Sequence, residues 1–507
     1  MSLPVVEGED MTKWTISTAI LLAAYILSAQ EGRVTVPKIW DDKALEDWAT
    51  PIAALGVRPN QFTAAEYYAV PGENLRTYPV YRPGREPSGY WEWLQKQKPE
   101  PLVDTAKRRT REDWVRAGEI AFQTIGSTTL ASGLATADPE KIKLYRDPKA
   151  YEGVWTRADG SLLVARSVVT DHGIELRAAA CAGCHARARE DGTVFWAAPR
   201  GPTPGGKRDI TLLPLAPADR EPAGIRSWRL FTVPWASDER IEKLRDAPDA
   251  ATLVSAIQGV RVPGVVSRPH GNPYYQTKIP DLNILQFSRY MDATATHRLR
   301  GPEDVARYAA FISGIDPMEF GKYKILTPEQ RRITLRYADE ELYAIGVYLM
   351  SLEPPRNPDS GPAALIARGR QVFTRETCIN CHVPPNYTSG KLTPAKGYTP
   401  PADHPNQPDI VNISVGTDSG LAMKTRKGTG FYKVPSLRGV WYRSLLLHDG
   451  SVASLEEMFD PDRLKPDHVP GGWIGPGLTK RAIPGHPFGL GLNTGDKAAL
   501  LAFLRSL

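Results

Sequence analysis

The chain has 507 residues, of which 41% are hydrophobic and 24% are charged. This composition is close to that of globular proteins, and the length leaves room for about three domains at roughly 150 residues each. A single small module, a disordered chain and a polytopic membrane protein are therefore excluded. The formal net charge is only +6 and the basic residues form no long run, so nucleic acid is not expected as a partner. The 43 glycines and 45 prolines predict long ordered loops between few regular elements.

The N-terminus carries a candidate targeting segment. Residues 14–29 are apolar and follow Lys13, and their number suits the hydrophobic region of a signal peptide better than a membrane span. Acidic residues precede Lys13, which is atypical of a signal peptide, so both Met1 and Met11 are candidate starts. We interpret residues 1–30 as a signal peptide or an uncleaved anchor.

Residues 31–106 form a segment rich in Trp, Tyr and Pro, for example in 89–93 (GYWEW). Few helical periods occur there. We predict an extended N-terminal arm that packs over a larger body through its aromatic side chains, with a separate ligand-binding module as the alternative.

The first large unit is predicted over residues 107–353. A helical pattern ends in Gly118 to Phe122, and a second helical pattern covers 340–349, after Pro328 to Gln330. Between them, 161–169 has the composition of a strand. We therefore expect helices at both ends of this unit and a β insertion inside it.

A second unit repeats the first in shorter form. Residues 354–358 (PPRNP) cannot continue a helix and are interpreted as a linker to a unit at 361–507. Its Gly369 to Phe373 matches the first Gly and Phe pair, and its last helix is predicted over 494–504 with Thr494 as a candidate N-cap. The first unit is much longer. We interpret its extra length as a pocket or tunnel, with padding or partner docking as alternatives.

All four cysteines lie in two Cys-x-x-Cys-His strings, one in each unit. This string is the attachment pattern of haem c, in which the two thiols bind the porphyrin and the His binds the iron. A four-cysteine zinc site would place its two strings about 15 to 20 residues apart, and here they are far more distant. We therefore predict two covalently attached haem c groups, and hence export. The residues are Cys181, Cys184 and His185 in the first unit and Cys378, Cys381 and His382 in the second.

Two further strings point to a family. Residues 431–440 (FYKVPSLRGV) and 447–457 (LHDGSVASLEE) resemble the second haem domain of the bacterial di-haem cytochrome c peroxidase and MauG superfamily. The wide separation of the haem strings and 485–489 (GHPFG) resemble its rubber oxygenase branch. The resemblance implies a mainly α fold with two cytochrome c-type haem domains, long loops and small β insertions, beside the N-terminal arm. It also implies that one haem transfers electrons while the other reacts.

The resemblance leaves the sixth ligand of the second iron open. Members of the family place a Met or Tyr at the position that is Asp462 here, and Asp is a poor haem ligand. By analogy with the bis-His second haem of rubber oxygenases we expect His486, with His448 and Met458 as alternatives.

For the first haem the resemblance implies His185 on one side and an apolar, aromatic face on the other. We expect this face within 279–291 and the helix that follows. The candidate catalytic residues are His185, Phe287, Tyr290 and Phe311, together with Tyr308. Ordinary core packing would explain the same aromatics, and Met291 or His297 could instead close the iron as a sixth ligand. Other candidates are His270 and Arg289 as hydrogen-bond donors and Trp228 and Trp441 as residues between the haems.

These inferences give a functional hypothesis. We expect a periplasmic or secreted di-haem oxidoreductase in which the haem at His185 reacts with peroxide or dioxygen and the haem at His382 transfers electrons. The partner would be a small redox protein or a small-molecule oxidant, and the membrane would be involved only if the N-terminal segment stays uncleaved. The family resemblance also allows one calcium ion. The alternative is a non-catalytic electron-transfer cytochrome.

Overall fold

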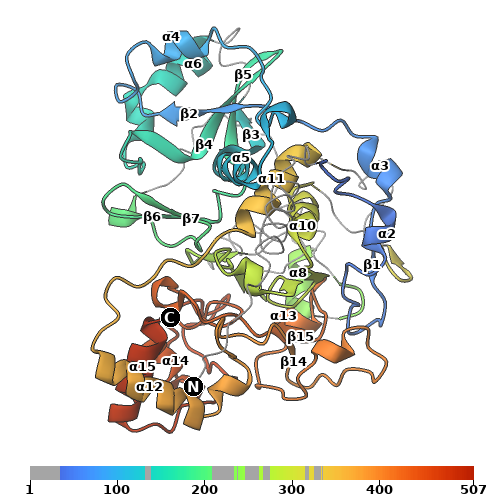
Figure 1. Ribbon diagram of the computed structural model, residues 1–507, viewed down its shortest axis with the longest axis vertical. Helices are drawn as coiled ribbons and strands as arrows, with labels where there is room; N and C mark the ends of the chain where they lie inside the picture. The colour runs from blue at the N-terminus through green and yellow to red at the C-terminus, as the bar shows by residue number, and fades with distance from the viewer. Residues whose placement is uncertain are drawn as a thin grey trace, which may run out of the picture.

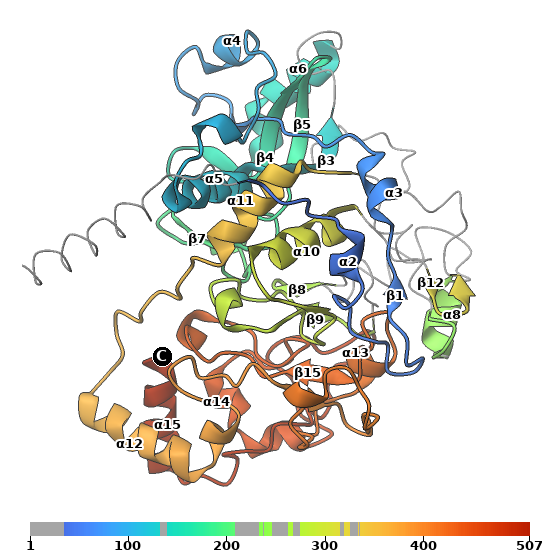
Figure 2. The same ribbon diagram turned by 45° about the vertical axis from the view of Figure 1, so that its right-hand side comes forward.

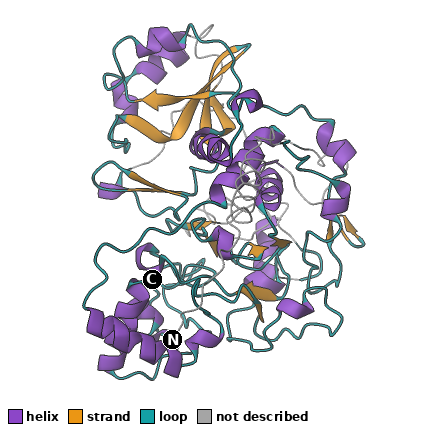
Figure 3. Cartoon of the chain, in the orientation of Figure 1, coloured by secondary structure: helices purple, strands orange, loops and turns teal. Residues whose placement is uncertain are grey.

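The computed structural model describes residues 35–131, 139–207, 233–236, 238–245, 262–266, 274–314, 319–324, 333 and 335–507. The candidate signal segment, His270, Trp228 and Pro328 to Gln330 lie outside these residues. The described chain is rich in helices and carries small antiparallel sheets, with long loops between them (Figures 1 and 3). This agrees with a mainly α chain with small β insertions. The boundaries of the units and their character as haem domains stay predictions.

The helices are mostly short. They are α2 (Asp42–Leu45), α3 (Ala64–Tyr68), α4 (Tyr90–Leu94), α5 (Arg111–Thr124), α6 (Pro139–Arg146), α8 (Glu239–Arg245), α10 (Pro302–Gly314), α11 (Asp339–Leu349), α12 (Ala363–Arg375), α13 (Gly420–Met423), α14 (Leu455–Met458) and α15 (Thr494–Arg505). The longer ones, α5, α10, α11, α12 and α15, build two separate helical cores.

The two cores share one packing arrangement. In the first, α5 packs on α11, and in the second α12 packs on α15. Each crossing is closest at the glycine that the sequence had singled out. A Cβ atom on Gly118 would overlap the backbone oxygen of Ala344, and one on Gly369 would overlap that of Ala499. Glycine therefore lets the helices approach backbone to backbone.

The N-cap of the last helix differs from the prediction. Asn493, and not Thr494, caps α15, because its side chain accepts a hydrogen bond from the backbone N–H of Asp496. Asn and Thr both serve as N-caps, and the sequence did not decide between the neighbouring positions.

Within the described residues the strands form six small sheets. They are β1 (Pro59–Asn60), β2 (Thr77–Tyr81), β3 (Gly126–Ala131), β4 (Ser161–Thr170), β5 (Gly173–Ala179), β6 (Ala186–Ala188), β7 (Val194–Trp196), β8 (Val265–Val266), β9 (Thr277–Lys278), β10 (Tyr290–Met291), β11 (His297–Arg298), β12 (Glu319–Phe320), β13 (Tyr323–Lys324), β14 (Leu392–Pro394) and β15 (Phe431–Lys433). The largest has the order β2-β4-β5-β3. Its central strand β4 contains the predicted strand-like stretch, so the insertion before the first Cys string folds as a sheet.

The aromatic-rich N-terminal segment is part of the core as well as an outer layer. Its strand β2 forms one edge of the four-stranded sheet, and Trp40, Trp48 and Tyr67 are fully buried. In Figure 2 this segment runs along one side of the molecule from the neighbourhood of α13 to the sheet. At its lower end the backbone N–H of Ala53 donates to the carbonyl of Gly428 at 2.8 Å. The segment thus joins the two parts of the chain.

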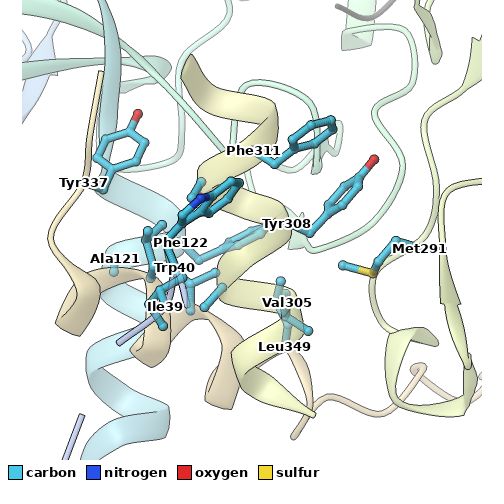
Figure 4. Close-up of a cluster of buried hydrophobic side chains, with 14 of the residues drawn as sticks. Ile39, Trp40, Ala121, Phe122, Met291, Val305, Tyr308, Phe311, Tyr337 and Leu349 are labelled. Carbon is cyan, nitrogen blue, oxygen red and sulfur yellow. The ribbon is translucent and has the colours of Figure 1, made fainter. Parts of the chain in front are cut away.

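The central core of the first unit gathers these aromatics with the helices α5, α10 and α11. Figure 4 shows Trp40 and Phe122 at the centre of this cluster, with Tyr308 and Phe311 projecting from α10 and Met291 beyond them. Cys181 packs against the same cluster. The first Cys string therefore lies beside a large apolar core.

Candidate functional site

In the second unit the Cys string presents a histidine whose orientation is fixed. His382 is buried, and its Nδ1 lies 3.1 Å from the carbonyl oxygen of Tyr387. A carbonyl only accepts, so Nδ1 carries the hydrogen and Nε2 keeps its lone pair for a metal. The two thiols, on Cys378 and Cys381, are free and partly exposed. This arrangement is the one that a haem-binding His requires.

A second imidazole faces His382. The ring centres of His382 and His486 are 6.4 Å apart. An imidazole nitrogen binds a first-row metal at roughly 2 Å, and the ring centre lies about 1 Å further from the metal. Two imidazoles that bind one metal from opposite sides therefore have ring centres about 6 Å apart. Burial, aided by the nearby His382, lowers the pKa of His486 to about 4, so the ring is neutral and able to bind a metal. Its Nδ1 is buried without a hydrogen-bond partner.

One buried arginine holds the loop that carries His486. Arg463 is fully buried and donates from Nε to the carbonyl of Met458 at 3.0 Å and from Nη1 to that of Ile483 at 2.7 Å. Its Nη2 donates to the carbonyls of Gly485 at 2.9 Å and His486 at 2.8 Å. His486 has a φ of 49°, a value that non-glycine residues rarely adopt. We infer that Arg463 maintains this strained backbone and so positions the imidazole.

The alternative sixth ligands have other surroundings. The ring of His448 lies 4.6 Å from that of Tyr432, and Met458 is buried in the apolar cluster that contains Phe373 and Phe503. Of the three candidates, His486 is the one that the described structure places against His382.

In the first unit the histidine of the Cys string also lies within hydrogen-bond distance of a backbone carbonyl. His185 is buried, and its Nδ1 lies 3.1 Å from the carbonyl oxygen of Pro280. His382 likewise interacts with the carbonyl of Pro435, in addition to that of Tyr387. Both prolines stand in an apolar-Pro-x-Leu string, 279–282 (IPDL) and 434–437 (VPSL). Sequence reasoning missed this pair, although comparison of the two units would have found it.

The predicted distal residues of the first unit lie in three different surroundings, and their role stays a prediction. Phe287 lies under the guanidinium of Arg438, 5.0 Å from its ring centre. Tyr290 belongs to a different buried cluster, and its hydroxyl donates to Asp409 at 2.7 Å. Phe311 packs in the central core. The expectation of a distal face within residues 279–291 rests on aromatic composition. Composition does not reveal the direction in which each side chain points.

The remaining candidates lie near the boundary between the units. Arg289 forms an exposed ion pair with Asp409, and the Trp441 indole donates to the carbonyl of Pro355 at 3.1 Å. A polar link between the units, buried beside the first Cys string's histidine, was not predicted. The hydroxyl of Tyr442 donates to Asp281 at 2.5 Å, directly after the proline that accepts from His185.

No group of three or more His, Cys, Asp or Glu residues suited to a metal ion occurs within the described ranges, so the calcium ion stays a prediction. None of the helices in that part of the chain has the length and apolar composition that crossing a membrane requires.

Comparisons with known proteins give distant structural neighbours. No family model and no curated protein matches the sequence. Among solved structures, hydrazine synthase from Kuenenia stuttgartiensis superposes with a TM-score of 0.28 and 12% identity, over 56% of this chain and 88% of that one. A MauG-like protein associated with microbial copper homeostasis gives a TM-score of 0.29 and 18% identity, over 58% and 91%. Scores this low do not define a shared fold.

Proposed function

We propose that the chain is an exported oxidoreductase with two covalently attached haem c groups. The observation that carries the proposal is internal to the chain: each Cys string ends in a buried His whose Nδ1 lies 3.1 Å from a backbone carbonyl oxygen, the orientation that a haem-binding His requires. Cys181 and Cys184 would hold one haem, and Cys378 and Cys381 the other.

The haem groups would supply redox-active iron, and the protein residues would set how each iron is used. In the second unit, His382 and His486 would bind opposite sides of one iron, which favours electron transfer because no site remains for a small oxidant. In the first unit, the apolar core beside Cys181 would exclude water around His185. We therefore assign the reaction with peroxide or dioxygen to the His185 unit and electron transfer to the His382 unit.

The first experiment tests the haem content. The full chain, expressed in a bacterium that attaches haem c in its periplasm, is expected to carry two haems by intact mass after denaturation. Replacing Cys378 and Cys381 by Ser, or Cys181 and Cys184 by Ser, is expected to remove one haem in each case. A chain that reaches the periplasm with no attached haem would overturn the proposal.

The second experiment tests the unequal roles. EPR of the ferric protein is expected to show one low-spin haem that His486→Ala converts to high spin, whereas His448→Ala leaves it unchanged. A second, high-spin haem is expected to respond to hydrogen peroxide, or to air after reduction. Loss of the low-spin signal in His448→Ala would reassign the ligand.

One observation favours the electron-carrier alternative. Met291 is buried in the same cluster against which Cys181 packs, so its thioether is a candidate sixth ligand for the first iron. In that case both haems are low-spin and inert to peroxide, and Met291→Leu creates a high-spin haem. This outcome would replace the enzyme hypothesis by an electron-transfer cytochrome.

A further inference from the structure

A small cavity lies where three parts of the chain meet. Its volume is about 20 Å³, and its lining includes Gln61 of the N-terminal segment, His297 of β11, Phe311 of α10 and Lys427 of the second unit. One water molecule needs about 10 to 15 Å³ when volume is measured in this way. The cavity therefore has room for a guest slightly larger than one water molecule.

The imidazole of His297 is the first group that requires a guest. It is 4% exposed and is enclosed by aromatic rings, with the ring centre of Trp48 at 4.1 Å and that of Phe311 at 4.8 Å. Its Nε2 is buried and has no hydrogen-bond partner. A buried polar atom without a partner costs about 1 to 3 kcal/mol, so such atoms usually bind a water or a ligand.

The tautomer of His297 follows from its neighbours. The Thr296 hydroxyl donates its single hydrogen to the carboxylate of Asp292 at 3.1 Å. Toward the imidazole the same oxygen can only accept, so the Nδ1 of His297, 3.0 Å away, donates to it. Burial lowers the pKa of His297 to about 3, and the ring is neutral. Its Nε2 is therefore a bare lone pair, and the guest must donate a hydrogen bond.

Gln61 is the second such group. Both its side-chain oxygen and its nitrogen are buried without a partner. The oxygen adds a second acceptor and the nitrogen a donor. A guest that satisfies the cavity therefore carries two donor hydrogens and also accepts a hydrogen bond.

The surrounding charges disfavour a cation, and the lone pair of His297 disfavours a simple anion. Lys427 and Arg426 line the cavity, which disfavours a cation. The carboxylate of Asp292 is already engaged by the ammonium of Lys427 at 2.7 Å and by the hydroxyls of Thr296 and Tyr308. A simple anion and dioxygen both lack the hydrogens that the His297 lone pair needs. A small neutral hydroxylic molecule remains.

We propose that this cavity is a binding site for a small neutral molecule with two hydroxyl hydrogens, held between His297 and Gln61. Water and hydrogen peroxide share this chemistry, and both are small enough. The site itself requires no haem. Its use for peroxide rests on the proposed function, because an oxidoreductase of that kind would consume peroxide nearby.

High-resolution crystal structures of the full haem-loaded chain test the site, with one set of crystals untreated and one soaked in hydrogen peroxide. Density for a guest within hydrogen-bond distance of the His297 Nε2 and the Gln61 amide is expected. A single oxygen in both sets identifies water, and elongated density in the soaked set identifies peroxide. An empty cavity in both sets, or a guest that does not contact the His297 Nε2, overturns the proposal.

Two variants sharpen the test. His297→Phe keeps an aromatic ring against Trp48 but removes the acceptor, and Gln61→Leu removes the other partner while His297 stays. Each is expected to lose the guest, whereas His172→Phe, at an exposed histidine, is expected to retain it. If His297→Phe does not fold, the Gln61 variant still decides. Haem content measured on the same samples separates failure of this site from failure of the proposed function.

Discussion

The two units of the chain share a helix crossing and a braced histidine but differ in what surrounds them. In each, a glycine brings two helices into backbone contact, at Gly118 in the first and Gly369 in the second. In each, a proline carbonyl contacts the His of the Cys string. The shared features are local to each unit, and each follows from a short string of residues.

The differences come from longer contacts. The second unit places His486 against His382 through a loop held by one arginine. The first unit adds a four-stranded sheet and receives the N-terminal segment, which brings Trp48 onto His297. The shared helix crossing is thus accompanied in the second unit by a fixed pair of histidines and in the first by added layers. Under the proposed function, this difference would suit the second unit to electron transfer and the first to a reaction that needs a sheltered pocket.

The largest expected effect comes from a variant that disrupts the helix crossing found in both units. Gly369→Ala would place a methyl group on the backbone oxygen of Ala499, which cannot move unless α12 and α15 separate. We expect a loss of roughly 4 kcal/mol in the free energy of unfolding, above the usual cost of an overpacked core. Urea denaturation measures it.

The matched control is Gly491→Ala, because nothing lies within 4 Å of a Cβ atom at that position. Gly118→Ala is expected to behave like Gly369→Ala. If only one of the two crossing variants were destabilised, the helix crossings would not be equivalent and the comparison would fail.

A smaller effect sharpens the difference between the units. Arg463→Met removes the donors to four backbone carbonyls, including that of His486. The loss is expected to be about 3 kcal/mol, because unsatisfied buried carbonyls outweigh the gain from not burying a charge. In the haem-loaded protein the low-spin signal assigned to His382 and His486 should weaken.

Lys465→Met is the control for this variant, since Lys465 forms only an exposed ion pair with Asp462 and such pairs contribute little. If Arg463→Met lost stability but kept an unchanged EPR spectrum, Arg463 would support the fold without positioning His486. Restoration of the signal by Arg463→Lys would support a positioning role.

The sequence predicted what depends on neighbouring residues. The strand β4 and the helices α11 and α15 follow from local patterns, whereas the boundary between the units stays a prediction. Composition does not fix side-chain direction: Phe287, Tyr290 and Phe311 lie in three different surroundings, and their role beside the first haem stays a prediction. Arg463 and the cavity at His297 could not be predicted, because they depend on contacts between residues distant in the chain.

The smallest expected effect concerns the first unit alone. In the folded protein burial lowers the pKa of His297 to about 3, whereas in the unfolded chain it is about 6.5. Between these values the unfolded chain binds a proton that the folded chain does not, so stability falls as the pH falls below about 6.5. At about 1.4 kcal/mol per pH unit, the free energy of unfolding should fall by about 2 kcal/mol between pH 6.5 and 5 because of His297.

The variant His297→Phe should lose this pH dependence of the free energy of unfolding, and His172→Phe, at an exposed histidine, should retain it. Equal slopes of stability against pH for the wild type and His297→Phe would mean that His297 takes up its proton in the folded protein as readily as in the unfolded chain, and so is protonated below about pH 6.5. Its Nε2 would then be a donor, and the hydrogen-bond argument for a hydroxylic guest would fail with it.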